Sequence, residues 1–264
     1  MGVTMHIIDK QMIARSFGQA ASTYDSVAHF QRWTGERLLE KLPQIKPELI
    51  LDLGCGTGFF STHLKRLFPQ SSYIGMDLSE QMAVYAQSHH AENRNWLVGD
   101  AEALPLADHS IDLVFSSLAI QWCSDLPLLM KEIKRVLKPN GCFVFSTLLD
   151  GSLKELKAAW SVLDDKQHVN DFYSFDDHQI ALKSADFEII ELNEESKALS
   201  YHKLTDLMKE LKKLGAHNLN SDRSTVLMGK DKLAVLIAEY EKFRQHNDIL
   251  PASYQILWGV VKKA

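Results

Sequence analysis

Three alternating glycines, Gly54, Gly56 and Gly58, directly follow a short apolar run that closes with Asp52. Glycine has no side chain to hold a ligand away from the backbone, and it adopts positive φ without strain. The segment after the glycines, 59–68, has helical apolar spacing, so its free N–H groups would suit an anionic or carboxylate-bearing ligand. Strand, turn and helix together predict a nucleotide-like site. The spacing is G-x-G-x-G rather than the dinucleotide fingerprint G-x-G-x-x-G, which weakens the case for a nicotinamide cofactor.

Two acidic residues stand where the next two strands should end. Asp77 follows Gly58 by nineteen positions, and in doubly wound nucleotide folds a carboxylate at about this distance accepts hydrogen bonds from a ribose diol. Asp100 closes the third apolar run. Its carboxylate can accept from an exocyclic amino group while the N–H of Ala101 donates to a ring nitrogen, which would select adenine. The three strand ends therefore predict an adenosine-binding edge.

A polar cluster near the beginning of the chain contains Tyr24, Asp25, His29 and Arg32. It brings a hydroxyl, a carboxylate, an imidazole and a guanidinium within a few helical turns. A capped, solvated helix pair and a lid over a substrate explain this cluster equally well.

The elements around these residues alternate between strand and helix. Residues 1–14 are expected to be frayed, and two helices are expected within 15–42. Five strands then alternate with helices as far as Asp150, which predicts a right-handed, doubly wound, mostly parallel sheet. Two more strands, 187–192 and 253–260, enclose two amphipathic helices. The fold class is thus α/β, a Rossmann-like, seven-stranded, mostly parallel sheet with helices on both faces.

This pattern divides the chain into three expected parts. Residues 1–42 form an N-terminal helical lid, 43–150 form the ligand-binding core, and 151–264 complete the sheet. A helical insertion at about 203–248 would cover the substrate.

Composition excludes several classes of protein. With 45% hydrophobic and 24% charged residues in a chain of 264, a sizeable core is expected. The net charge of -5 disfavours general binding to nucleic acid or to anionic membranes. No apolar run is long enough to span a membrane and no signal peptide is visible, so a cytoplasmic location is expected. The three cysteines lack metal or disulfide spacing, and we expect reduced thiols and no metal site.

The motifs together resemble the class I S-adenosylmethionine-dependent methyltransferases. The resemblance rests on 52–58, Asp77, 99–101 with the following Leu-Pro-Leu, and 135–141, and it covers 47–147. It implies S-adenosyl-L-methionine as cofactor and S-adenosyl-L-homocysteine as product. The cofactor-binding residues that it implies are Asp52, Gly54, Gly56, Gly58, Asp77, Leu78, Asp100, Ala101 and Ser117.

Further segments resemble the malonyl-acyl-carrier-protein O-methyltransferase (BioC) family of biotin synthesis, from about Arg15 to Gly259. These segments are 16–25, 116–123, 145–148 with 152–156, 215–218 and 250–255. The resemblance implies methylation of the free carboxylate of a malonyl thioester, carried by an acyl-carrier protein or by coenzyme A. That carboxylate is already ionised near neutral pH, so the reaction needs positioning and desolvation but no catalytic base.

Polar residues outside the cofactor motifs are the candidates for the substrate side. We favour Tyr24 and Gln121 as catalytic, because one lies on the expected lid and the other at the end of the fourth strand. The remaining candidates for contact with substrate are His29, Arg32, His168, Asn170, His217 and Asn218. Each histidine is as readily explained as a surface or capping residue. A basic cluster on the insertion would meet an acidic carrier protein, or would simply be a solvated helix face: Lys209, Lys212, Lys213, Arg223, Lys230 and Lys232.

Several rival functions stay open on these residues. A C- or O-methyltransferase of the quinone-biosynthesis type would need a base beside an acceptor carbon. A nucleic-acid methyltransferase or a metal-dependent O-methyltransferase lacks its characteristic residues in this sequence. From other classes, an NAD-dependent oxidoreductase has the wrong glycine spacing, and a non-catalytic module could retain the same pocket. We expect a monomer.

Overall fold

The computed structural model describes residues 9–90, 95–216 and 229–264. One seven-stranded sheet organises it, with the strand order β3-β2-β1-β4-β5-β7-β6. The strands are β1 (Leu49–Leu53), β2 (Ser72–Asp77), β3 (Trp96–Val98), β4 (Ile111–Ser117), β5 (Leu137–Leu148), β6 (Phe187–Tyr201) and β7 (Leu250–Lys263). Neighbouring strands are parallel from β3 to β5, whereas β7 is antiparallel to both β5 and β6. The predicted seven-stranded, mostly parallel sheet is confirmed.

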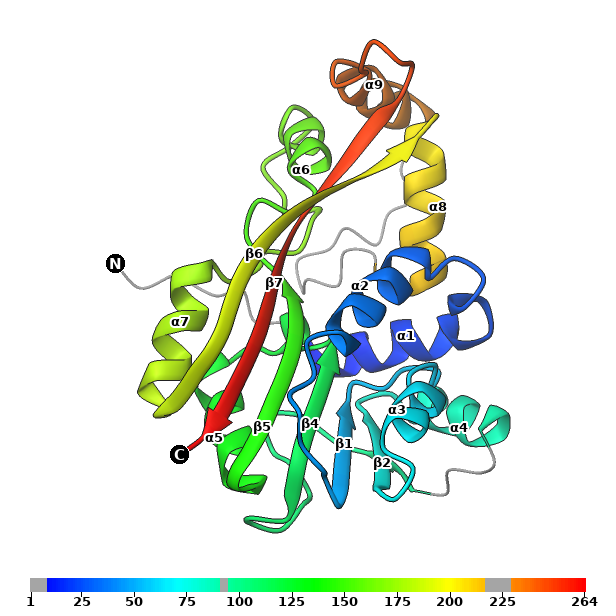
Figure 1. Ribbon diagram of the computed structural model, residues 1–264. Helices are drawn as coiled ribbons and strands as arrows, with labels where there is room; N and C mark the ends of the chain where they lie inside the picture. Colours follow the sequence, from blue (N-terminus) through cyan, green and yellow to red (C-terminus); the bar gives the residue numbers. More distant parts are fainter. Residues whose placement is uncertain (1–8, 91–94, 217–228) are drawn as a thin grey trace.

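Strand order reverses between β1 and β4, since β2 and β3 extend the sheet on one side of β1 and β4 and β5 extend it on the other. In such sheets, ligands bind beyond the carboxyl ends of the strands at this reversal. Figure 1 shows β1 and β4 pointing upward toward α1 and α2, with β5 ending higher, beside α2.

Helices cover both faces of the sheet because alternate strand residues point to opposite sides. Ile50 belongs to one apolar core, with Phe30 and Leu38 of α2. Its neighbour Leu51 belongs to the other core, with the buried stripe of α5. The helices are α1 (Lys10–Tyr24), α2 (His29–Leu39), α3 (Ser61–Leu67), α4 (Glu80–His89), α5 (Leu126–Val136), α6 (Lys154–Ser161), α7 (Phe175–Ser184), α8 (Leu204–Leu214) and α9 (Lys230–Glu241), together with the short 3₁₀ helix η1 (Ile120–Trp122).

The structure corrects three boundaries. Helix α1 begins at Lys10, inside the segment expected to be frayed, because the carboxylate of Asp9 caps it by accepting from the backbone N–H of Gln11 and Met12. β6 continues to Tyr201 and β7 begins at Leu250, and the two strands pair along their whole lengths. The polar second half of β6 hid this extension from an analysis of apolar runs.

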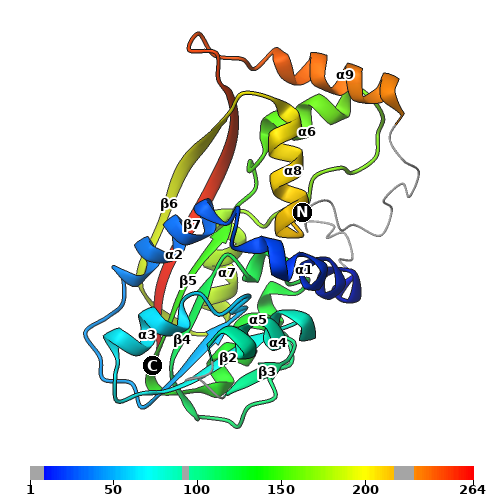
Figure 2. The ribbon, with the colours of Figure 1, turned by 90° about the vertical axis from the view of Figure 1, so that its right-hand side faces the viewer.

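The insertion between β6 and β7 carries α8 and α9. Together with α6, these helices stand around the upper ends of β6 and β7, beyond the end of β5 (Figures 1 and 2). Two hydrogen bonds fasten the end of the insertion's first helix to α1: Ser16 Oγ donates to the carbonyl of Gly215 at 2.9 Å, and Thr23 Oγ1 donates to the carbonyl of Lys213 at 3.0 Å. The expected lid and insertion therefore touch. The division of the chain into three parts stays a prediction.

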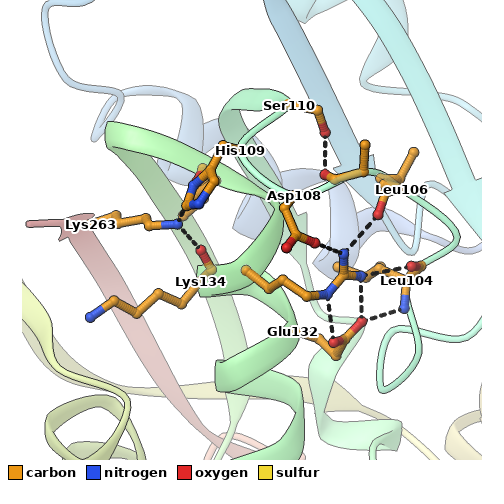
Figure 3. A network of polar contacts seen from close by, with 11 residues as sticks. Leu104, Leu106, Asp108, His109, Ser110, Glu132, Lys134 and Lys263 are labelled. Atoms are coloured by element: carbon orange, nitrogen blue, oxygen red, sulfur yellow. Dashed lines mark hydrogen bonds and ion pairs between the residues drawn. The ribbon is translucent and has the colours of Figure 1, made fainter.

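The opposite edge of the sheet is closed by a polar network (Figure 3). The Arg135 guanidinium donates to Glu132, to Asp108 and to the carbonyls of Leu104 and Leu106, at 2.7–2.9 Å. Lys263, near the end of β7, is buried and its ammonium contacts the carbonyls of Lys134 and Leu137. Hydrogen bonds and ion pairs within the protein therefore hold this edge together.

Across the described residues, no helix has both the length and the apolar character required to cross a membrane. The same part of the chain holds no group of three or more His, Cys, Asp or Glu side chains arranged to bind a metal ion.

Candidate active site

The glycine turn after β1 forms the floor of the site. The backbone N–H groups of Gly54 and Cys55 donate to the carbonyl of Met76 at 2.7 and 3.0 Å, which holds the turn against β2. Gly54 has φ of 74°, and a Cβ there would lie 2.2 Å from the Cβ of Ala119, so glycine is required. At Gly56, with φ of 55°, a Cβ would meet no atom within 4 Å. The backbone of Gly56 is therefore open to the cavity beside it.

Asp77 lies at the end of β2 and faces this turn. Its two carboxylate oxygens accept from the backbone N–H of Ser79 at 2.8 Å and of Gly56 at 2.9 Å. Burial raises the pKa of Asp77, while these backbone donors lower it. Each oxygen retains a further lone pair, which is the arrangement that a ribose diol needs.

Asp100 is paired with a residue that the sequence analysis missed. Lys10, the first residue of α1, donates to Asp100 Oδ2 at 2.5 Å and also pairs with the buried Glu102. Asp100 Oδ1 accepts from the backbone N–H of Glu102 at 2.9 Å. Because Lys10 and Asp100 are ninety positions apart, no local sequence signal could have linked them.

A first cavity of about 780 Å³, including its opening to solvent, joins these groups. Seven of the nine predicted cofactor residues line it: Gly54, Gly56, Asp77, Leu78, Asp100, Ala101 and Ser117. A bare turn for a carboxylate-bearing tail, a carboxylate for a diol and a carboxylate beside a free backbone edge for adenine fit S-adenosylmethionine.

The other two predicted cofactor residues, Asp52 and Gly58, do not line the cavity. Asp52 is buried beneath the turn, where it accepts from the hydroxyl of Tyr73 at 2.7 Å, and burial raises the pKa of its carboxyl to about 7. Gly58 packs against the ring of Trp96, which a Cβ would approach to 2.6 Å. Both residues support the turn from behind.

A second cavity, of about 690 Å³ including its opening, adjoins the first. Four residues line both cavities, Phe17, Tyr24, Leu118 and Trp122, and we call this set the neck. The rings of Phe17 and Trp122 meet edge to face, with centroids 5.2 Å apart. Leu118 has a left-handed backbone, with φ of 49°, a strained conformation of the kind that gathers at functional sites. A methyl group passing between the cavities would cross an apolar, largely aromatic constriction.

The structure brings four of the predicted substrate-side residues to the second cavity: Tyr24, Gln121, His168 and Asn170. Two others lie elsewhere. His29 is exposed and lines neither cavity. Arg32 donates to the carbonyl of Asp25 at 2.6 Å and stacks over the ring of Phe59, so it fixes the turn between α1 and α2. Neither residue lines either cavity, and their contact with substrate stays a prediction. His217 and Asn218 lie outside the described residues.

Tyr24 is suited to donate a hydrogen bond. Burial, with the carboxylates of Asp77 and Asp25, raises the pKa of its hydroxyl, so the group stays protonated at neutral pH. Among the described residues, its hydroxyl makes no hydrogen bond to another side chain or to the backbone. It is therefore free to donate to a ligand at the neck.

Gln121 is not free in the same way. Its Nε2 donates to the carbonyl of Leu118 at 2.8 Å, and its Oε1 accepts from Thr147 Oγ1 at 3.4 Å. The side chain thus fixes the strained backbone of the neck. A neighbouring amide that the sequence analysis did not select, Gln31 on α2, also lines the second cavity.

The sheet order, the glycine turn and the acidic ends of β2 and β3 define the chain as an S-adenosylmethionine-dependent methyltransferase of class I. A family model described as "Methyltransferase domain" matches residues 51–145. The YcgJ protein of Bacillus subtilis shares the fold, with a TM-score of 0.62 at 20% identity over 88% of this chain and 98% of that one. So does a geranyl diphosphate C-methyltransferase from Streptomyces coelicolor solved with S-adenosyl-L-homocysteine, with a TM-score of 0.55 at 16% identity over 88% of this chain and 79% of that one.

Similarity to curated proteins narrows this class. The malonyl-[acyl-carrier protein] O-methyltransferase of Hahella chejuensis is 41% identical, over 94% of this chain and 89% of the relative. The protein of the same name from Methylovorus sp. is 40% identical, over 98% and 90%. The chain belongs to the malonyl-[acyl-carrier protein] O-methyltransferase family. It is also 42% identical to the biotin biosynthesis bifunctional protein BioHC of Cellvibrio japonicus, of which it spans 51%.

Proposed function

We propose that this enzyme transfers a methyl group to the free carboxylate of a malonyl thioester carried by an acyl-carrier protein, giving the methyl ester that starts pimeloyl synthesis for biotin. The single observation that carries the proposal is the second cavity, which adjoins the cofactor cavity through the neck. Its described lining contains no Lys, Arg, Asp or Glu and is mostly apolar. Such a cavity suits a substrate whose nucleophile arrives already charged.

The neutral lining has a chemical reason. A lysine or arginine in contact with the attacking carboxylate would occupy its lone pairs in a strong ion pair and weaken it as a nucleophile. Neutral donors hold the same carboxylate with less withdrawal of charge. Removal from bulk water then strengthens the attraction between the carboxylate and a sulfonium at the neck.

When bound, S-adenosylmethionine supplies an electrophilic methyl group on a sulfonium and leaves as S-adenosyl-L-homocysteine. Asp77 would hold its ribose, and Asp100 with Ala101 would hold its adenine. A carboxylate oxygen in the second cavity would form the new C–O bond as the S–CH₃ bond breaks, with the electron pair of that bond left on sulfur. No proton moves, which agrees with a site that offers donors but needs no base.

We propose that Tyr24 donates its hydroxyl hydrogen bond to the substrate carboxylate. Tyr24→Phe keeps the ring and removes only that donor. We expect kcat/KM for the malonyl thioester to fall about 10- to 100-fold, since a hydrogen bond to a charged group is lost, while the affinity for cofactor stays the same. Unchanged methyl-ester formation would remove Tyr24 from the mechanism.

His168 and Asn170 are proposed to contact the acyl thioester or the arm that carries it. The His168 ring stacks on Trp160, and its Nε2 lies 2.6 Å from Asp164 Oδ1, so the imidazole is fixed at the cavity wall. A fixed imidazole suits a substrate group that must be oriented.

The basic residues of α8 are proposed to meet the carrier protein. Lys212 and Lys213 lie between Leu211 and Leu214, which line the second cavity. Lys209 and Lys232 lie 3.8 and 3.7 Å from the acidic partners Asp206 and Asp164. Lys230 is exposed at the start of α9, and Arg223 lies outside the described residues. We propose that Lys212 and Lys213, which are exposed and adjoin cavity-lining residues in sequence, lie near the entrance for the acyl chain.

Charge reversal tests this docking surface. Lys212→Glu with Lys213→Glu should raise KM for malonyl-carrier protein several-fold. It should also make turnover less sensitive to salt, because salt screens the attraction between exposed charges that this double substitution removes. KM for malonyl-CoA should change less. If neither salt nor charge reversal alters turnover with the carrier substrate, the docking proposal fails.

The decisive experiment for the function offers labelled S-adenosylmethionine with malonyl-carrier protein, malonyl-CoA and free malonate side by side, followed by mass analysis of the ester. We expect the methyl ester with malonyl-carrier protein at the lowest substrate concentration. Formation of no ester from any of the three would contradict the proposed substrate and return the chain to the broader methyltransferase class.

A further inference from the structure

We propose that Gln31, on the first turn of α2, is the amide that positions the substrate carboxylate in the second cavity. This inference rests on the proposed function and names a residue that neither the motifs nor the family likeness selects.

The argument starts from the need of the substrate. A carboxylate enters a cavity whose described lining provides no cationic Lys or Arg, so its oxygens must accept from neutral groups. Besides the indole of Trp122, six polar side chains line that cavity: Tyr24, Gln31, Gln121, His168, Asn170 and Tyr254. The question is which of them has a donor to spare.

Existing partners exclude three of the six. Both ends of the Gln121 amide are engaged, by the Leu118 carbonyl and by Thr147. His168 is paired through Nε2 with Asp164, and Asn170 also has a partner in the protein. The three that remain are Tyr24, Gln31 and Tyr254, and of these Gln31 is the amide.

The amide of Gln31 has hydrogen-bonding capacity that the described residues do not use. Its Oε1 is shielded from solvent and has no hydrogen-bond partner among them. None of them accepts from its Nε2 either. The Nε2 hydrogens are therefore available to a substrate carboxylate, which can only accept hydrogen bonds.

The position of Gln31 suits this role. It follows the α1–α2 turn, which the bond from Thr57 Oγ1 to Asp25 Oδ1, 2.9 Å long, ties to the glycine turn of the cofactor site. Next to it, Phe30 is buried and its ring stacks on Tyr254 with centroids 4.5 Å apart. The backbone that carries Gln31 is therefore fixed relative to both the cofactor turn and the second cavity.

Two substitutions separate positioning from structural support. Gln31→Leu removes the amide and its unsatisfied oxygen together, so the melting temperature should stay the same or rise. KM for the malonyl thioester should rise about 10-fold or more, as for loss of one hydrogen bond to a charged group. The dissociation constant of S-adenosylmethionine should stay within about twofold, because Gln31 does not line the cofactor cavity.

Gln31→Glu gives a pH signature that a structural role would not produce. An ionised Glu would repel the substrate carboxylate, so kcat/KM near pH 8 should fall about 100-fold. On protonation, the carboxyl regains a donor, and the activity relative to wild type should recover as the pH falls toward 5.5. Gln179→Glu on α7 is the matched control, because its Oε1 already accepts from Lys183 at 3.1 Å, on the surface and outside both cavities.

The outcomes distinguish this inference from the function on which it rests. If wild type forms the malonyl ester but Gln31→Leu keeps kcat and KM within about threefold, Gln31 does not position the carboxylate and the inference fails alone. Loss of melting temperature in parallel with activity, without pH-dependent recovery of Gln31→Glu, would equally overturn it. If wild type forms no ester, the proposed function fails first.

Discussion

The two edges of the parallel sheet treat their polar groups in opposite ways. At the edge shown in Figure 3, Arg135 and Lys263 donate hydrogen bonds to carboxylates and carbonyls of the protein itself. At the other edge, the Oε1 of Gln31 has no partner among the described residues, Asp77 keeps acceptor capacity, and the backbone of Gly56 faces open space. One edge contributes stability, and the other keeps groups unsatisfied for ligands.

The largest expected effect is on cofactor affinity. Asp77→Asn removes the charge that strengthens the two hydrogen bonds to the ribose diol, so the dissociation constant of S-adenosylmethionine, measured by titration calorimetry, should rise about 10- to 100-fold. The matched control is Asp112→Asn at the opposite edge, where the carboxylate accepts from the backbone N–H of Glu48 and Leu49. That variant should lose stability and keep its affinity. Equal effects on affinity would erase the contrast between the edges.

A second test removes a hydrogen-bond donor from the edge shown in Figure 3. Lys263→Met leaves the carbonyls of Lys134 and Leu137 without their donor in a buried position. The free energy of unfolding in urea should fall by about 1–3 kcal/mol, with cofactor affinity unchanged. Weaker cofactor binding at unaltered stability would contradict a purely structural edge.

The third prediction concerns pH. Burial raises the pKa of Asp52 to about 7, above its ordinary value of 3.8. The folded state therefore holds a proton that the unfolded state has released, and Asp52 makes stability fall as pH rises between about 4 and 7. Asp52→Asn should be more stable than wild type at pH 8, and the difference should shrink toward pH 5. Urea unfolding of both proteins across this range checks it, and a constant difference would refute it.

The smallest effect is expected at Cys55 in the glycine turn. Burial and the nearby carboxylates of Asp77 and Asp52 raise the pKa of the Cys55 thiol, so no thiolate is available as a nucleophile. Cys55→Ala should leave methyl transfer within about twofold of wild type. A loss of activity beyond tenfold, with normal cofactor affinity, would give Cys55 a role that the structure does not indicate.

Much of the fold could be predicted because its signals are local. Apolar runs ending in Asp52, Asp77 and Asp100 specify three strands, and the glycines between them specify a turn. The second half of β6 was missed because Glu194, Glu195 and Lys197 break the apolar pattern, and only pairing with β7 defines it as a strand.

The part of the site that lies in local sequence motifs could be predicted. The part that is assembled only by tertiary folding could not. Motif residues such as Asp77 and Ala101 reach the cofactor cavity directly from strand ends. Lys10 and Gln31 carry no motif, and only folding brings them to the cavities. Arg32 resembled a substrate ligand in type and position, yet its guanidinium is held by the Asp25 carbonyl and the Phe59 ring.

The neck is shared by the two cavities, so a molecule bound in one cavity would lie next to a molecule bound in the other. Phe17, Tyr24, Leu118 and Trp122 touch whatever fills either cavity. If binding of one molecule changes the binding free energy of the other, the second changes the binding free energy of the first by the same amount. If a non-reactive cofactor analogue lowers the dissociation constant of the malonyl substrate by some factor, the malonyl substrate must lower the dissociation constant of the analogue by the same factor.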